Sequence, residues 1–180
     1  MLEYQLTKHI YNDKIQTTVL KNNKRNNYNM KYKKHMNSKI GNIDIIEENN
    51  KIIEIRVNKN IKDNSIEKDT ILLNETEKQL NEYFDKKRKK FDLPLNPQGT
   101  EFMKKVWKSL QNIPYGETKT YKQIAEEVGN SKASRAVGIA NHKNPIPIII
   151  PCHRVIGSNG KLVGYALGMD MKSFLLELEK

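Results

Sequence analysis

The chain has 180 residues, of which 37% are hydrophobic and 29% charged, which is ordinary for a globular protein of one domain or two small ones. Its single cysteine excludes an internal disulfide and a zinc site built from several cysteines. No stretch has the apolar length of a membrane span, and residues 1–13 lack the core of a signal peptide. We therefore expect a cytoplasmic protein with no membrane partner.

The chain is strongly basic, with a formal net charge of +11 and an isoelectric point near 9.6. Such an excess of lysine and arginine favours polyanionic partners, because each phosphate that they neutralise releases a counterion. A genome rich in A and T encodes much lysine and asparagine and gives the same charge without any nucleic-acid partner. The charge alone leaves both explanations open.

The N-terminal half begins its recognisable pattern at residues 21–39, which contain seven lysines or arginines and no acidic residue. They show no apolar period, which is typical of a solvated loop or mobile segment rather than a binding arm. Two runs of β-branched residues follow, at 43–46 and 52–57, with Asn49 and Asn50 between them. These runs predict a β-hairpin.

A helix is expected after the hairpin. Asn74 is a suitable N-cap with Glu77 three residues later, and the shared apolar face consists of Leu80, Tyr83 and Phe84. The basic string "DKKRKKFDLPLNPQG" closes the helix. Its two prolines and its glycine predict a linker at residues 90–99.

Three helices are predicted in the next part of the chain, the first two of them from apolar stripes. The first stripe ends at "NIPYG" and consists of Phe102, Met103, Val106, Trp107 and Leu110. The second is stopped by Gly129 and consists of Tyr121, Ile124, Ala125 and Val128. After the short turn "NSK" a third helix begins around Ala133. Two short helices joined by a tight turn are a helix-turn-helix candidate, a pattern that many all-helical cores share.

The last predicted helix is capped by Asp170, and its inward-facing residues are Phe174, Leu175 and Leu178. Glu179 lies four residues after Leu175 on the same stripe, close to the negative end of the helix dipole. Two interpretations of Glu179 are open. It is either a frayed terminal charge or an acid that turns inward to orient a histidine.

The single cysteine stands in "IIIPCHRVIG", residues 148–157. A lone cysteine is usually a small buried hydrophobe. Pro151 biases Ile150 toward an extended conformation, so the isoleucine run predicts a buried, strand-like segment. His153 and Arg154 follow Cys152 directly, and nearby positive charge or a basic imidazole raises the thiolate fraction of a cysteine. We therefore expect an ionised sulfur, bridged to His153 by water, because neighbouring side chains of an extended chain diverge.

Two long strings carry a resemblance to a known family: "FMKKVWKSLQNIPYGETKTYKQIAEEVGN" and "ASRAVGIANHKNPIPIIIPCHRVIGSNGKLVGY". Residues 100–179 resemble the catalytic domain of the methylated-DNA-protein-cysteine methyltransferases, which repair 6-O-alkylguanine. The N-terminal half carries no motif of the family. The resemblance implies an α+β fold, with an auxiliary α/β domain with an antiparallel sheet at 1–95. A mostly helical, DNA-binding catalytic domain with the helix-turn-helix follows at 98–180.

The resemblance also implies roles for single residues. Cys152 is the alkyl acceptor, His153 its base through a water, and Glu179 the carboxylate that orients the histidine. Tyr121 hydrogen-bonds the leaving guanine, and Asn144 ties the recognition helix to the active-site segment. The remaining implied site residues are Arg135, which fills the space of the extruded nucleotide, and the pocket residues Val155 (through its carbonyl), Tyr165 and Ala166.

A third implication concerns the reaction and the DNA. The alkyl group moves irreversibly to Cys152 in a single turnover, from 6-O-alkylguanine or secondarily 4-O-alkylthymine, after the base is flipped out of duplex DNA. The small residues Ala133 and Ala136 suit the minor groove. No cofactor and no metal are expected, and the protein is expected to be a monomer. Leu167 stands where the family commonly has a glycine, so it either narrows the pocket or repacks.

Two other functions stay open. A helix-turn-helix regulator with a structural cysteine predicts sequence-selective DNA binding and an inert thiol. A cysteine hydrolase that uses Cys152, His153 and Glu179 predicts repeated turnover on an acyl substrate. The adjacent Cys152 and His153 argue against a pure DNA reader, which has no need of them.

Overall fold

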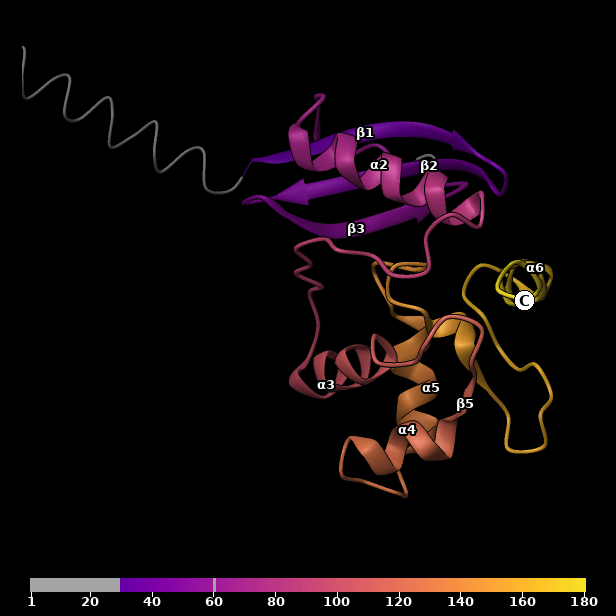
Figure 1. The fold of residues 1–180 in the computed structure, drawn as a ribbon. Helices are drawn as coiled ribbons and strands as arrows, with labels where there is room; N and C mark the ends of the chain where they lie inside the picture. The colour runs from indigo at the N-terminus through magenta and orange to yellow at the C-terminus, as the bar shows by residue number, and fades with distance from the viewer. Residues whose placement is uncertain (1–29, 60) are drawn as a thin grey trace, which may run out of the picture.

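The computed structural model describes residues 30–59 and 61–180. Figure 1 shows a twisted sheet covered on one face by a helix, and beside it a group of shorter helices that includes the C-terminal one. The sheet has the strand order β3-β2-β1-β4, and its strands are β1 (Lys31–Ser38), β2 (Gly41–Glu48), β3 (Lys51–Val57) and β4 (Ile66–Glu67). β1, β2 and β3 are antiparallel, and β4 pairs with β1 in parallel. The predicted α+β class is confirmed.

The predicted hairpin is present as β2 and β3, with Ile43 opposite Val57. Asn49 and Asn50 have φ angles of 54° and 55°. Two consecutive left-handed residues form the two-residue turn whose twist matches that of the flanking strands, and asparagine tolerates this conformation well. The core face of the hairpin consists of isoleucines that are almost wholly inaccessible to solvent, among them Ile43, Ile45, Ile52 and Ile55.

A loop was predicted at residues 21–39. Residues 21–29 lie outside the described residues, and the prediction is wrong for residues 31–38. Residues 31–38 form β1, which pairs with β2 along its whole length. Only Met36 of this strand is buried, so the apolar signal is too sparse to detect. Lys34 is accommodated by side-chain contacts to Asp69, Asn74 and Glu77. The neighbouring strand β2 contributes most of the buried apolar side chains, so β1 needs few of its own and is defined mainly by its pairing with β2.

Helix α2 (Ile71–Phe84) covers the sheet, but it begins earlier than predicted. Thr70 is its N-cap and accepts a hydrogen bond from the Leu73 amide at 3.1 Å, whereas Asn74 lies within the helix. Leu73 is fully buried, so the apolar face of the helix begins about two turns earlier than the predicted stripe. The predicted face is otherwise correct, because Leu80, Tyr83 and Phe84 are buried.

The segment predicted as a linker is ordered against the sheet. The Ile52 amide donates to the Pro94 carbonyl, and the Asn96 amide donates to the Ile52 carbonyl, both at 2.8 Å. The Ile55 amide donates to the Pro145 carbonyl at 2.8 Å. These bonds use the free edge of β3, so the helical half is attached to the sheet and does not hang from a flexible tether.

The helical half contains α3 (Glu101–Leu110), α4 (Tyr121–Glu127), α5 (Ser134–His142) and α6 (Met169–Leu178). A parallel pair of two-residue strands, β5 (Lys119–Thr120) and β6 (Val155–Ile156), and the one-turn 3₁₀ helix η1 (Cys152–Arg154) complete it. The three helices predicted in this part of the chain are present as α3, α4 and α5. The buried Trp107 indole donates to the Ala140 carbonyl at 2.8 Å and so joins α3 to α5.

Three predictions in this half are wrong. The isoleucine run is buried but is a turn rather than a strand-like segment, because Ile148 has a φ of 75° and the Ile150 amide donates to the Ile146 carbonyl at 2.9 Å. Helix α6 is preceded by Gly168 at a φ of 92°, and Asp170 lies in its first turn rather than at its cap. Leu175 faces the core as predicted, but Phe174 is 40% exposed.

In the part of the chain that the structure describes, no helix is both long and apolar enough to cross a bilayer.

Candidate active site around Cys152

Cys152 opens the 3₁₀ turn η1 directly after Pro151, and its side chain is 3% exposed. The Asn144 amide nitrogen Nδ2 donates to Cys152 Sγ at 3.1 Å and to the Ile150 carbonyl at 2.8 Å. The Asn144 oxygen Oδ1 accepts from the Ile146 amide at 3.0 Å. One asparagine therefore holds both the isoleucine turn and the sulfur.

The expectation of an ionised sulfur is not supported at rest. Burial raises the pKa of the Cys152 thiol, and the hydrogen bond from Asn144 and the charge of Lys172 oppose this effect without reversing it. The resting residue is therefore a thiol. Its proton has to leave when the sulfur reacts, so a base near the sulfur is needed.

His153 has the arrangement of such a base. Its ring is fully buried, and Nε2 lies 2.8 Å from Glu179 Oε1. Burial lowers the pKa of His153, although the hydrogen bond to Glu179 acts in the opposite direction. A neutral imidazole beside a carboxylate carries its proton on Nε2, which leaves Nδ1 as the acceptor. Among the described residues no group bonds to His153 Nδ1, so it is free to take a proton.

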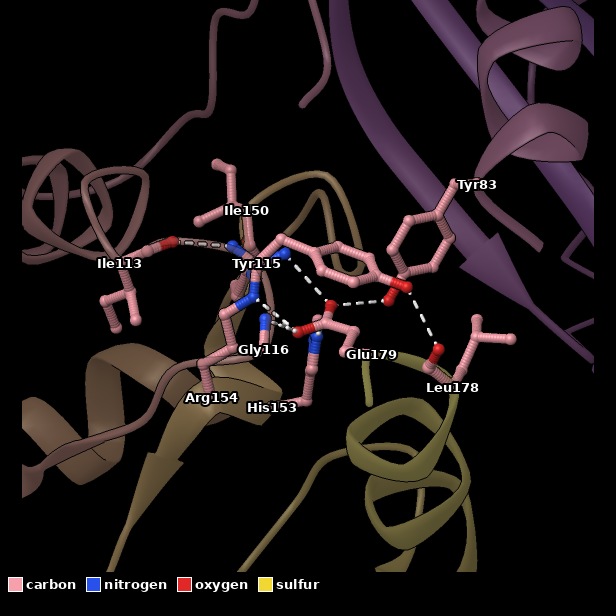
Figure 2. Close-up of polar contacts among 10 residues, drawn as sticks. Tyr83, Ile113, Tyr115, Gly116, Ile150, His153, Arg154, Leu178 and Glu179 are labelled. Carbon is pink, nitrogen blue, oxygen red and sulfur yellow. Dashed lines mark hydrogen bonds and ion pairs between the residues drawn. The ribbon is translucent and has the colours of Figure 1, made fainter. Parts of the chain in front are cut away.

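Glu179 directly follows α6, at the end of the helix where a negative charge is least favourable. Five hydrogen bonds to the Glu179 carboxylate compensate for this unfavourable position (Figure 2). The donors are the Tyr83 hydroxyl, His153 Nε2, Arg154 Nε and Nη2, and the Gly116 amide, at 2.7–3.3 Å. Burial alone raises the pKa of Glu179, but the bonds from His153 and Arg154 outweigh it and lower the pKa to about 2. The carboxylate is thus charged at neutral pH, and the frayed-terminus interpretation is wrong.

A cavity of about 550 Å³ lies in front of the sulfur, within the ~300–1,000 Å³ range of small-molecule pockets. Cys152 lines it together with residues of α4, α5 and the loop before α6: Tyr121, Arg135, Gly138, Asn141, Val163, Tyr165 and Ala166. A Cβ on Gly138 would lie 3.8 Å from the Tyr121 ring, an ordinary contact. The fold therefore does not require glycine at 138, but any side chain there would stand at the cavity wall.

Tyr121 and Lys172 hold the loop that forms one wall. The Tyr121 hydroxyl donates to the Val163 carbonyl at 3.2 Å, and Lys172 Nζ donates to the carbonyls of Val163 at 2.9 Å and Val155 at 2.6 Å. Burial raises the pKa of Tyr121, and a charge on Cys152 adds to this effect. Tyr121 is therefore a protonated donor at neutral pH. The wall of the cavity thus holds a thiol and a protonated phenol, Cys152 and Tyr121.

Comparisons with known proteins agree with this chemistry. Residues 31–97 match the family model described as 6-O-methylguanine DNA methyltransferase, ribonuclease-like domain, and residues 101–180 match the corresponding DNA binding domain. A methylated-DNA–protein-cysteine methyltransferase of Methanosarcina acetivorans is 63% identical over 58% of this chain and 67% of that protein. The constitutive enzyme of Bacillus subtilis is 52% identical over 65% of this chain and 72% of that protein.

The chain belongs to the methylated-DNA–protein-cysteine methyltransferase family.

A solved structure supports the fold of this methyltransferase as well. The Mycobacterium tuberculosis OGT in complex with DNA has a TM-score of 0.78 and 41% identity, over 83% of this chain and 92% of that one. The likeness extends over both halves. DNA is therefore a partner of the family, and this chain is a DNA-binding methyltransferase involved in DNA repair.

The structure brings most of the predicted site residues together. Cys152, Tyr121, Arg135, Tyr165 and Ala166 line one cavity. His153 follows Cys152 in the chain and is hydrogen-bonded to Glu179. Leu167 lines a separate cavity of about 70 Å³ that also touches Cys152 and β3, so its contact with the larger pocket is indirect. The Val155 carbonyl already accepts from Lys172. Ala133 is the residue before α5 and Ala136 is half-buried on it; neither lines the cavity.

Sequence reasoning missed several residues of this site: Tyr83, Gly116, Asn141, Arg154 as a ligand of Glu179, and Lys172. Gly116 has a φ of 78°, and a Cβ there would come within 2.9 Å of the Glu179 carbonyl. The "IPYG" motif thus marks a close approach of two backbones. Tyr83 and Lys172 look like ordinary helix residues in the sequence, and only the tertiary structure reveals their contacts.

Proposed function

We propose that this chain repairs alkylated DNA by moving the alkyl group of 6-O-alkylguanine to Cys152. The observation that carries the proposal is the position of Cys152 on the wall of the cavity, next in the chain to His153, whose ring is hydrogen-bonded to Glu179. A saturated carbon calls for a soft nucleophile, which sulfur provides. 4-O-alkylthymine is a secondary candidate substrate, because it offers the same type of carbon–oxygen bond.

The proton and the bonds balance as follows. His153 Nδ1 takes the thiol proton through a water while Cys152 sulfur forms a bond to the alkyl carbon, and the carbon–oxygen bond of the base breaks. The electron pair returns to the purine, and Tyr121 donates a proton to a ring nitrogen. The proton held by His153 then restores Tyr121 through solvent. The product is a thioether, which no group of the cavity can hydrolyse, so each molecule acts once.

The alkylated base has to leave the duplex to reach the sulfur, because Cys152 is only 3% exposed. We propose that α4 and α5 act as a helix-turn-helix that lies in the minor groove. Arg135, exposed on α5 at the rim of the cavity, occupies the space of the flipped base. The small Ala133 and Ala136 at the start of α5 permit a close approach to the DNA backbone.

The remaining elements of the proposal concern organisation. Residues 1–95 serve as the auxiliary domain and residues 98–180 as the catalytic one. The protein acts as a monomer in the cytoplasm. The reaction as written uses no cofactor, since the alkyl carbon, the sulfur and the transferred protons are the only participants.

Mass spectrometry tests the proposal directly. The protein is incubated with a duplex oligonucleotide that carries one 6-O-methylguanine, and the intact protein and its peptides are weighed. We expect a single replacement of the thiol hydrogen by a methyl group, on Cys152, at one methyl per molecule. Cys152→Ser is the matched control and should gain nothing. An unchanged mass, or repeated turnover on excess DNA, would contradict the proposal.

A further inference from the structure

Tyr83 is the point at which the sheet half of the molecule reaches the active site. It lies near the end of α2, 96 residues before Glu179, and its hydroxyl donates to Glu179 Oε1 at 2.7 Å. Figure 2 shows the ring entering from the α2 side toward the carboxylate. Among the described residues, the other donors to Glu179 are Gly116, His153 and Arg154, all from the helical half.

The Tyr83 hydroxyl is held rigidly. Its ring is fully buried and packs against Phe84, Phe91 and Tyr115, with ring centroids 5.6, 5.4 and 6.2 Å away. Burial, together with the charge of Glu179, raises the pKa of Tyr83 far above its ordinary value. The hydroxyl therefore remains protonated, and able to donate, at neutral and moderately alkaline pH.

Tyr83 and His153 share one oxygen atom. Glu179 Oε1 accepts from the Tyr83 hydroxyl, from His153 Nε2 at 2.8 Å and from Arg154 Nη2 at 2.9 Å. Each donor withdraws negative charge from that oxygen. The more charge Tyr83 withdraws, the less the carboxylate favours a protonated imidazole.

We propose that Tyr83 is a positioning residue for the transfer reaction. Its hydroxyl holds the Glu179 carboxylate in place and partly neutralises its negative charge. Through this contact the N-terminal half sets the basicity of His153. The inference rests on the proposed function, because it assigns His153 as the base. It gives the auxiliary half a chemical task in the reaction, in addition to its packing.

The other charged groups around His153 fix the direction of the effect. Arg154 on η1 and Lys172 on α6 disfavour the imidazolium, and Glu179 favours it, while burial is the largest influence. Cys152 directly precedes His153 in the chain. The Tyr115 ring lies beside Tyr83, but its hydroxyl donates to the Leu178 carbonyl at 2.9 Å and not to Glu179. Tyr83 acts on His153 only through Glu179. Loss of its hydroxyl leaves a less neutralised carboxylate, which raises the pKa of His153.

The test is the pH dependence of methyl transfer from a 6-O-methylguanine duplex under single-turnover conditions. In Tyr83→Phe, His153 becomes protonated at a higher pH and cannot accept the thiol proton there. We expect the acid limb of the rate profile to move up by about half a pH unit or more. Tyr115→Phe is the matched control, because it removes a neighbouring hydroxyl that does not touch Glu179; its acid limb should coincide with that of the unaltered protein.

A second variant keeps both the shape and the hydroxyl. A ring-fluorinated tyrosine at position 83 is a stronger donor, so it should move the acid limb in the opposite direction, to lower pH. In a Glu179→Gln background, Tyr83→Phe should cause no further displacement of the limb. An acid limb that stays in place in both variants overturns the inference, even if the plateau rate falls, because packing alone would explain such a fall. An unaltered protein that takes up no methyl group contradicts the proposed function instead.

Discussion

Asn144 and Cys152 lie eight residues apart and are joined by a hydrogen bond of 3.1 Å from the Asn144 amide to the sulfur. The same nitrogen donates to the Ile150 carbonyl, within the turn that contains the left-handed Ile148. A β-branched residue in that conformation costs on the order of 1–3 kcal/mol and persists only when its surroundings enforce it. The asparagine is one such constraint.

Asn144→Ala should therefore affect both stability and reaction. Loss of the bonds to Ile150, Ile146 and the sulfur should lower the free energy of unfolding by roughly 1–3 kcal/mol. Misplacement of the sulfur should slow methyl transfer by roughly 10- to 100-fold. Chemical denaturation and single-turnover rates measure the two effects. Asn112→Ala, on an exposed asparagine, should change neither; equal effects in both variants would contradict the role of Asn144.

Glu179 should make the free energy of unfolding depend on pH in acid solution. Its pKa is lowered from 4.5 to about 2 in the folded protein, which corresponds to about 3 kcal/mol. Because the folded pKa is the lower one, this contribution is complete above pH 4.5 and is lost as the pH falls toward 2. Denaturation curves between pH 6 and 2 should show the loss. Glu179→Gln should lack this part of the acid dependence and be less stable at neutral pH, since buried Arg154 loses its charged partner.

The thiol of Cys152 should be sluggish toward small reagents in the absence of DNA. Burial raises its pKa, so little thiolate is present at neutral pH, and the sulfur is 3% exposed. We expect iodoacetamide to modify it more slowly at pH 7 than it modifies glutathione, with a rise only in alkaline solution. Fast modification at neutral pH would indicate a resting thiolate and contradict this description of the site.

Tyr121→Phe should impair transfer while leaving the fold intact. Its hydroxyl donates to the Val163 carbonyl, which also accepts from Lys172, so this carbonyl keeps a partner in the variant. Loss of a donor to the departing base should slow transfer by roughly 10- to 1,000-fold. Rates and thermal denaturation check the prediction. Tyr32→Phe, on a partly exposed tyrosine of β1, serves as the control and should retain the full rate.

Arg135→Ala should reduce repair more than it reduces binding to undamaged DNA. The side chain is exposed at the rim of the cavity, and its proposed task is to stabilise the flipped state rather than to add one positive charge among many. Single-turnover rates and fluorescence anisotropy at two salt concentrations measure the two quantities. Lys132→Ala, a nearby exposed cation, should lower binding alone. Equal losses in both assays would argue against the role of Arg135.

The sequence predicted those parts of the molecule that depend on local pattern. The apolar stripes of α3 and α4 predicted these helices, the turn after α4 predicted the start of α5, and Asn49 and Asn50 predicted the hairpin turn. The motif around Cys152 indicated the residues to which we assign the roles of nucleophile and base, Cys152 and His153. Such features are encoded within a few residues, so a single sequence reveals them.

Other parts depend on contacts that a local pattern does not carry. Strand β1 is defined by its pairing with β2 rather than by apolar residues of its own. The bond from Tyr83 to Glu179 spans 96 positions, and Lys172 is buried because two carbonyls converge on it. The turn at Ile148 contradicts the extended preference of isoleucine. In each case the tertiary structure overrides the local propensity.

The link between Asn144 and the sulfur has a consequence for the spent protein. A methyl thioether is a poor acceptor and needs more room than a thiol, in a position where the sulfur is 3% exposed. Methylation should therefore weaken one of the restraints on residues 144–150. The methylated protein should therefore differ from the unmethylated protein in the protection of these residues against hydrogen exchange, and this difference would distinguish molecules that have reacted from those that have not.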